Sequence, residues 1–89
     1  MPSCELTIIN RLGMHARAAA EFTRTAAQFG ASIFVSKDGL EINGKSIMGV
    51  LMLAAAQGTM ITVRAEGDDA QPALEALTIL VENRFGEEE

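Results

Sequence analysis

The spacing of apolar residues along this chain changes repeatedly between a period of two and a period of three to four. Glu5 to Ile9 alternates polar with apolar residues and places Leu6 and Ile8 on one face. The next stretch, which begins at about residue 16, repeats its apolar residues every three or four positions, at Ala19, Phe22, Ala26 and Phe29. A period of two predicts a half-buried strand, and a period near 3.6 predicts an amphipathic helix. The chain must therefore combine both kinds of element around a shared core.

A predicted hairpin follows the first helix, which Gly30 is placed to end. Ile33 and Val35 alternate with serines, and Lys37-Asp38-Gly39 separates this run from the strand-like Leu40-Glu41-Ile42-Asn43. Asp-Gly between two such runs is typical of a tight turn, because both turn residues need a positive φ. We expect two antiparallel strands here.

The second half of the chain predicts a short helix, a strand and a long helix. Ser46 precedes the apolar stretch Ile47 to Leu53, and a serine oxygen can accept from the free amides that begin a helix. Ile61, Val63 and Ala65 then alternate with polar residues, and the loop Gly67-Asp68-Asp69 supplies acceptors for the next helix start. The last helix is expected over residues 70–85, with Gly86 as its stop and a fraying, solubilising tail at Glu87 to Glu89.

The resulting order, β-α-β-β-α-β-α, predicts an α+β fold. We expect an open-faced two-layer sandwich, with a four-stranded antiparallel sheet covered on one face by three helices. The 89 residues form a single domain, residues 1–89, without repeats or linkers. Because Trp and Tyr are absent, the four Phe residues are the large packing pieces of the core.

Charge and cysteine content exclude several classes of function. The formal charge is −5, from seven Lys plus Arg against twelve Asp plus Glu, which argues against a nucleic-acid-binding domain and against an anionic membrane surface. Cys4 has no cysteine partner, and we expect it to be an ordinary packing thiol. No apolar run is long enough for a signal or membrane-spanning segment. We expect a cytoplasmic protein that does not insert into membranes.

The one histidine, His15, stands where the first loop turns into a helix. Unpaired amides and the positive end of the helix dipole favour an anion there, so a phosphate on this imidazole would meet a preformed site. Arg17 adds a cation two residues further on. A neutral imidazole can accept a group as a nucleophile and later release it, which suits a carrier better than a hydrolase. No metal or bound cofactor is implied.

With this element order, the chain resembles the histidine-containing phosphocarrier (HPr) family of the bacterial phosphoenolpyruvate-dependent phosphotransferase system. Two motifs carry the resemblance: Gly13-Met14-His15-Ala16-Arg17, and the segment Asn43-Gly44-Lys45-Ser46-Ile47-Met48-Gly49 with the apolar residues that follow it. The match extends over nearly the whole chain. Both motifs at this spacing within this element order are specific to the family.

The resemblance implies a role for each motif. His15 would accept a phosphoryl group on Nδ1 from phosphorylated enzyme I and pass it to a histidine of an enzyme IIA domain, while Arg17 holds the phosphoryl oxygens. Ser46 resembles the regulatory serine that an ATP-dependent HPr kinase/phosphorylase modifies in some bacteria. A phosphate at that helix start would be stabilised locally and would repel an acidic docking face. Candidate docking residues are Arg24, Ile47, Met48, Leu51 and Met52.

Two alternatives stay open at this point. The family commonly has proline where this chain has Ala18, and the same scaffold also serves nitrogen-type regulatory systems, so the protein could act mainly as a phosphorylation-dependent interaction module. The apolar residues after Ser46 could equally belong to the core, and Arg24 could be a solvated charge. A monomer is the simplest expectation for the assembly.

Overall fold

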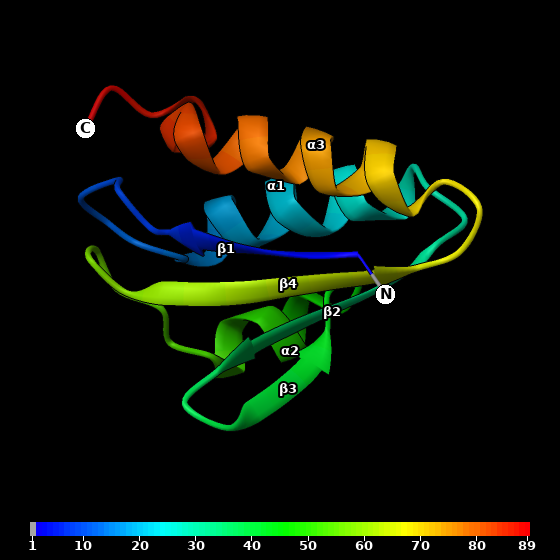
Figure 1. Ribbon diagram of the computed structural model, residues 1–89. Coiled ribbons are helices and arrows are strands. Elements are labelled where there is room, and N and C mark those ends of the chain that lie inside the picture. Colours follow the sequence, from blue (N-terminus) through cyan, green and yellow to red (C-terminus); the bar gives the residue numbers. More distant parts are fainter. Residues whose placement is uncertain (1) are drawn as a thin grey trace.

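Four strands form one antiparallel sheet in the order β1-β4-β2-β3, in a computed structural model that describes residues 2–89 (Figure 1). The strands are β1 (Ser3–Thr7), β2 (Ser32–Lys37), β3 (Leu40–Asn43) and β4 (Met60–Glu66). The helices are α1 (Ala16–Ala27), α2 (Ile47–Met52) and α3 (Ala70–Glu82), and a short 3-10 turn, η1 (Arg84–Gly86), follows them. The predicted α+β fold and element order are confirmed.

The period-two pattern decides which side of the sheet is buried. In the β1–β4 pair Leu6 lies opposite Ile61, and in the β2–β4 pair Val35 lies opposite Val63. All four side chains are buried, and their polar neighbours along the strands are exposed or half-buried. Since adjacent strand residues face opposite sides, this register turns one apolar face toward the helices.

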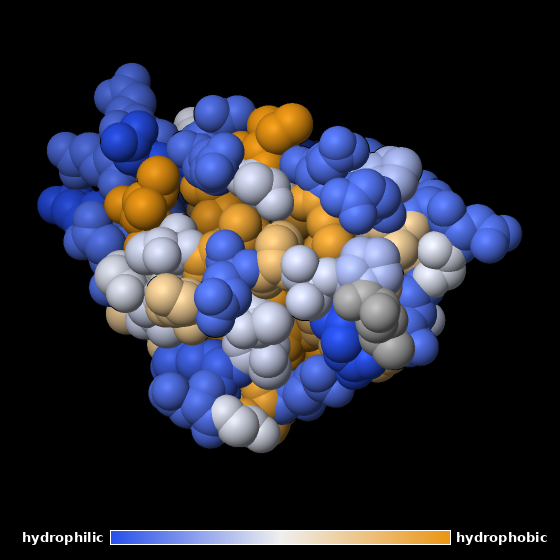
Figure 2. Space-filling model, in the orientation of Figure 1, coloured by the Kyte–Doolittle hydropathy of each residue, from blue (hydrophilic) through white to orange (hydrophobic). Residues whose placement is uncertain are grey.

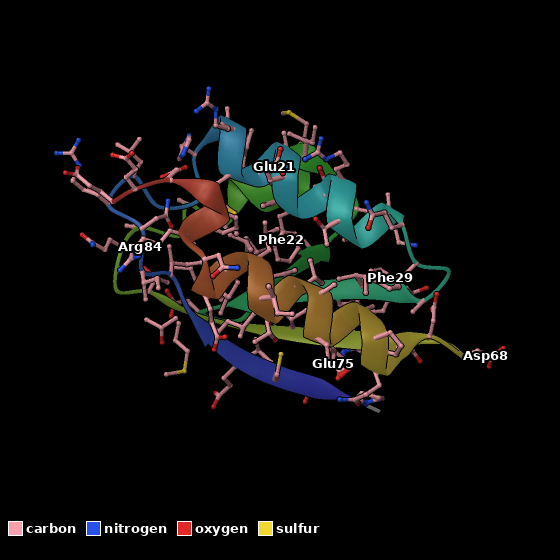
Figure 3. All side chains as sticks on the ribbon, turned by 90° about the horizontal axis from the view of Figure 1, so that it is seen from above. Glu21, Phe22, Phe29, Asp68, Glu75 and Arg84 are labelled. Atoms are coloured by element: carbon pink, nitrogen blue, oxygen red, sulfur yellow. The ribbon has the colours of Figure 1, made fainter. Side chains whose placement is uncertain are left out.

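The helices cover this apolar face. Figures 1 and 3 show α1 and α3 side by side over the sheet, and α2 packs against α1 and β3. Phe22 of α1 is fully buried, and Figure 3 places it between α1 and α3. Burying one such side chain contributes about 1.5–3 kcal/mol to stability. Its interior position follows from the three-to-four-residue spacing seen in the sequence.

The turn between β2 and β3 has the predicted geometry. Asp38 and Gly39 both have positive φ angles, 51° and 85°. Two positive φ values at the centre of a two-residue turn match the right-handed twist of the paired strands, which is why Asp-Gly is favoured there. The hairpin prediction is confirmed.

The end of the last helix differs from the prediction. Helix α3 ends at Glu82, and Arg84 and Phe85 have φ angles of 56° and 55°, in the left-handed region. This reversal lets Phe85 bury its ring, which is 6% exposed, against the core. The gain from burying the ring offsets the backbone strain of a left-handed residue. The expectation of a helix through residue 85 is therefore wrong.

The acidic tail does not fray as expected. The Arg11 amide donates to the Glu89 carbonyl, and the Arg11 Nε atom lies 3.1 Å from the Glu89 carboxylate. Glu87, with a side chain only 14% exposed, folds back toward the start of α1. The left-handed turn before Gly86 directs the chain back over the first loop, and these contacts hold it there.

Asp69 is the N-cap residue of α3, but its side chain bonds to the loop after α1 and does not cap its own helix. Its carboxylate accepts from the amides of Gly30 and Ala31, both at 2.8 Å, and makes no side-chain hydrogen bond to α3. Helix α1 itself ends at Ala27, three residues before the glycine expected to stop it. The hydrogen bond from the Gly30 amide lowers the pKa of Asp69, burial opposes this, and the Ala31 amide lowers it further.

We predict that Asp69→Asn lowers the melting temperature near neutral pH, because one acceptor oxygen is replaced by a donor facing two amides. The folded pKa of Asp69 lies below its ordinary value of 3.8, so its stabilisation is fully present above that value. This stabilisation is lost as the pH falls through the folded pKa, so the difference in melting temperature between wild type and Asp69→Asn should narrow in that pH range. Thermal unfolding at neutral and acid pH measures both effects.

The control is Asp68→Asn, which removes the same charge at an exposed neighbouring position. Equal melting temperatures for the two variants at neutral pH would contradict the role assigned to Asp69.

Candidate functional site

The loop between β1 and α1 is pinned to the segment that follows α2. The Met14 amide donates to the Ala55 carbonyl at 2.8 Å, and Gly13 has a φ of 67°. A Cβ atom on Gly13 would lie 2.7 Å from the Ala55 carbonyl oxygen, so this close approach requires glycine. The loop therefore enters α1 along a restricted path.

His15 is the N-cap residue of α1, as the sequence predicts. Its carbonyl accepts from the Ala19 amide at 2.8 Å, while its side chain makes no capping hydrogen bond and is 29% exposed. The first amides of the helix, including those of Ala16 and Arg17, have no acceptor within their own helix. The imidazole thus stands at the positive end of α1 and is not used as a structural cap.

The acidic tail contacts the imidazole of His15 at its Nε2 atom. The Nε2 atom of His15 makes a short contact with the Oε2 atom of Glu87. The other oxygen of Glu87 accepts from Asn10 Nδ2 at 2.9 Å, and the same amide nitrogen donates to the Gly13 carbonyl at 2.8 Å. Asn10 is fully buried. A buried amide therefore holds the carboxylate that contacts the histidine.

The charge state of Glu87 follows from these neighbours. Burial raises the pKa of its carboxyl group, but the hydrogen bonds from His15 and Asn10 and the charges of His15 and Arg17 outweigh it, so the pKa is lowered. An ionised carboxylate can only accept hydrogen bonds. The contact consequently requires the proton on Nε2. The Nδ1 atom makes no hydrogen bond to any residue from 2 to 89.

Arg17 stands in the first turn of α1 and is exposed. Within residues 2–89 its guanidinium makes no hydrogen bond or ion pair, although its charge contributes to the lowered pKa of Glu87. A planar guanidinium that is not engaged can bind two oxygens of a phosphoryl group at once. Together, His15, Arg17 and the first amides of α1 could receive an anion.

The second motif lies at the start of α2. Ser46 is the N-cap, and its hydroxyl oxygen accepts from the Gly49 amide at 3.1 Å, which confirms the predicted capping role. Ile47, Met48 and Met52 are exposed at 45%, 71% and 64%. Leu51 is half-buried and packs against the core, so this candidate docking residue is shared between the core and the surface. Helix α2 therefore presents an apolar surface next to α1.

Arg24, the remaining candidate docking residue, lies in the last turn of α1. Its guanidinium contacts the carboxylate of Glu21, one turn earlier, and its side chain is 69% exposed. This ion pair is a local surface contact, and such pairs contribute little to stability. Arg24 is accessible but does not belong to the group around His15.

Sequence reasoning missed two members of the site, Asn10 and Glu87. Asn10 follows a strand in a loop where asparagine is common, and Glu87 belongs to an acidic tail typical of a solvated end. Neither has a local pattern that separates it from its neighbours. The contact joins residues 72 positions apart, so no spacing in the sequence indicates it.

A hollow between β1 and α3 lies outside this group. Its lining includes none of the predicted site residues, and consists of Ser3, Cys4, Gln71, Leu74, Glu75, Thr78 and Ile79. Figure 2 shows apolar surface between α3 and β1, bordered by hydrophilic side chains. Cys4 is half-buried there, with its Sγ atom 3.8 Å from the Thr78 hydroxyl oxygen, in keeping with a packing thiol.

Residues 2–89 contain neither a membrane-spanning helix nor a metal-ligand cluster. None of their helices is long and apolar enough to cross a membrane. Likewise, no group of three or more His, Cys, Asp or Glu side chains in this part of the chain is arranged to hold a metal ion.

The sequence is similar to that of a known protein family. The family model described as the PTS HPr component phosphorylation site matches residues 2–83, a range that includes His15, Arg17 and Ser46. Phosphocarrier protein HPr of Xylella fastidiosa is 51% identical over 84 residues, which cover 94% of each chain. The corresponding protein of Pseudomonas aeruginosa is 47% identical over the full length of both chains.

The fold is also similar to solved structures. The crystal structure of HPr-C-His from Thermoanaerobacter tengcongensis matches with a TM-score of 0.96 and 45% identity, over the full length of both chains. The crystal structure of an HPr dimer from the same organism matches with a TM-score of 0.79, also at 45% identity, and covers 98% of this chain and 100% of that one. The present chain belongs to the HPr family of phosphocarrier proteins of the phosphotransferase system.

Proposed function

We propose that this protein carries a phosphoryl group on His15 between two partner proteins of the phosphotransferase system. The observation that carries the proposal is the state of His15, an N-cap residue whose Nδ1 atom is unengaged while Nε2 is held by Glu87. The donor is phosphorylated enzyme I, charged from phosphoenolpyruvate, and the acceptor is a histidine of an enzyme IIA domain. The relay operates in the cytoplasm.

The proposed reaction is a reversible in-line transfer between imidazoles. The Nδ1 lone pair of His15 forms the new N–P bond, and the N–P bond of the donor breaks with its electron pair left on the donor nitrogen. Arg17 and the first amides of α1 neutralise the phosphoryl oxygens. Positioning and charge stabilisation are the contributions of the protein. One arginine at an exposed helix start holds the group without making its onward transfer too costly.

The exposed surface of α2 supports a docking role. Ile47, Met48 and Met52 are accessible on a helix that packs beside α1, and methionine side chains adapt to differently shaped partners. We propose that both partners bind across this surface and the start of α1, so that each reaches His15 in turn. A monomer suffices for this exchange.

We further propose that Ser46 is a regulatory phosphosite for an ATP-dependent HPr kinase/phosphorylase. Its hydroxyl already faces the first amides of α2, next to the docking surface. A phosphate there would add about 1.5–2 negative charges at neutral pH. Repulsion against an acidic partner face would then slow docking.

We predict that His15→Ala abolishes phosphoryl acceptance from enzyme I, because no other residue in the chain is a histidine. The fold should stay intact, because the His15 side chain does not cap α1. Incubation with phosphoenolpyruvate and purified enzyme I, followed by intact mass and acid treatment, measures the reaction. Wild type should gain one acid-labile phosphoryl group. Ser46→Ala, the control, should gain the same group. An acid-labile gain in His15→Ala would refute the proposal.

We predict that Ser46→Asp slows acceptance from phosphorylated enzyme I without unfolding α2. Aspartate is as good an N-cap as serine, so the change adds charge and keeps the cap. Ser46→Ala is the matched control, which loses the cap at a cost of about 1 kcal/mol and adds no charge. Rapid-quench rates at low and high salt measure the effect, which salt should weaken. Equal rates for the Asp variant and wild type would remove the electrostatic argument.

A further inference from the structure

Glu87, which contacts His15, lies outside the segment that the family model matches, since that segment ends at residue 83. Glu87 is brought there by the left-handed turn at Arg84 and Phe85, and its side chain is 14% exposed. The contact is made at Nε2, the ring nitrogen opposite the one assigned to phosphoryl transfer. The tail therefore engages the histidine without occupying the reacting atom.

The contact determines which ring nitrogen carries the proton. Glu87 accepts from Asn10 through one oxygen and from His15 through the other, so both carboxylate oxygens have defined donors. Asn10 is fully buried and also bonded to the Gly13 carbonyl, which fixes its orientation. A neutral imidazole that donates through Nε2 has its lone pair on Nδ1.

We propose that Glu87 is a positioning residue for phosphoryl transfer, which keeps the proton on Nε2 of His15 and the nucleophilic lone pair on Nδ1. The inference rests on the proposed function and adds to it a residue beyond the two motifs. Asn10 supports the role by holding the carboxylate in place. Glu87 itself touches neither the phosphoryl group nor a partner in this role.

The protons and electrons of both half-reactions balance with this arrangement. On acceptance, the Nδ1 lone pair forms the N–P bond, the Nε2 proton stays in place, and the positive charge that develops on the ring lies against the Glu87 carboxylate. On donation, the N–P electron pair returns to Nδ1 and a neutral imidazole leaves with its Nε2 proton. Without that proton the leaving group would be an imidazolate anion, a far poorer one. A fixed carboxylate therefore assists both directions.

The test compares two charge-matched variants of the full chain. Glu87→Gln keeps the size of the side chain but leaves one acceptor oxygen for two donors, His15 and Asn10. Glu88→Gln removes the same charge at an exposed residue whose side chain makes no hydrogen bond or ion pair within residues 2–89. Circular dichroism and thermal unfolding establish that both variants fold.

The first measurement is made without a partner protein. Because the chain has one histidine, ring nitrogen signals in ¹⁵N-labelled protein belong to His15 alone. Wild type and Glu88→Gln should show a protonated Nε2, an unprotonated Nδ1 and an Nε2–H signal shifted downfield and slow to exchange. Glu87→Gln should lose that slow exchange and downfield shift. Identical spectra for the two variants would overturn the inference.

The second measurement is single-turnover acceptance from phosphorylated enzyme I. Glu87→Gln should reduce the transfer rate at saturation by roughly tenfold, as losing an outer partner that orients a histidine does, and leave the half-saturating concentration unchanged. Glu88→Gln should match wild type. If wild type accepts the phosphoryl group and Glu87→Gln and Glu88→Gln accept it at equal rates, the role of Glu87 is refuted while the proposed function stands. If wild type accepts no phosphoryl group, the proposed function fails, and the role of Glu87 with it.

Discussion

Burial of one face of the sheet beneath three helices is the constraint on which the site depends. Leu6, Val35 and Val63 point to the same side because strand residues alternate, and Phe22 of α1 belongs to the same buried core. Packing therefore fixes where β1 ends and where α1 begins. The loop between them, which carries His15, is held at both ends and is bonded to the Ala55 carbonyl through the Met14 amide.

Positive and negative charges both lie close to His15. In the proposed transfer, the positive end of α1 and the unengaged guanidinium of Arg17 would attract the phosphoryl oxygens, while the carboxylate of Glu87 contacts the far side of the ring. Under the proposed function, these opposite charges would together give a phosphoryl group on His15 an intermediate stability. That balance suits a carrier, since a group held too firmly could not be passed on.

Local patterns predicted the elements whose form depends on near neighbours. The Asp38-Gly39 turn, the Ser46 cap and the strand alternation are properties of a few adjacent residues, and the structure agrees with each. The errors arose where a distant partner intervened. Asp69 bonds to amides at residues 30 and 31, and α3 stops early because Phe85 turns back onto the core. Such contacts leave no periodic trace in the sequence.

The same division runs through the site. The order of residues alone places His15 at a helix start with Arg17 two positions later, because a loop followed by a helical period leaves amides free at that junction. The pairing of His15 with Glu87 and the burial of Asn10 arise only when the folded chain brings together residues 72 positions apart. That meeting depends on the path of the chain after α3, which the burial of Phe85 directs over the first loop and which the contacts of Glu87 and Glu89 then hold there.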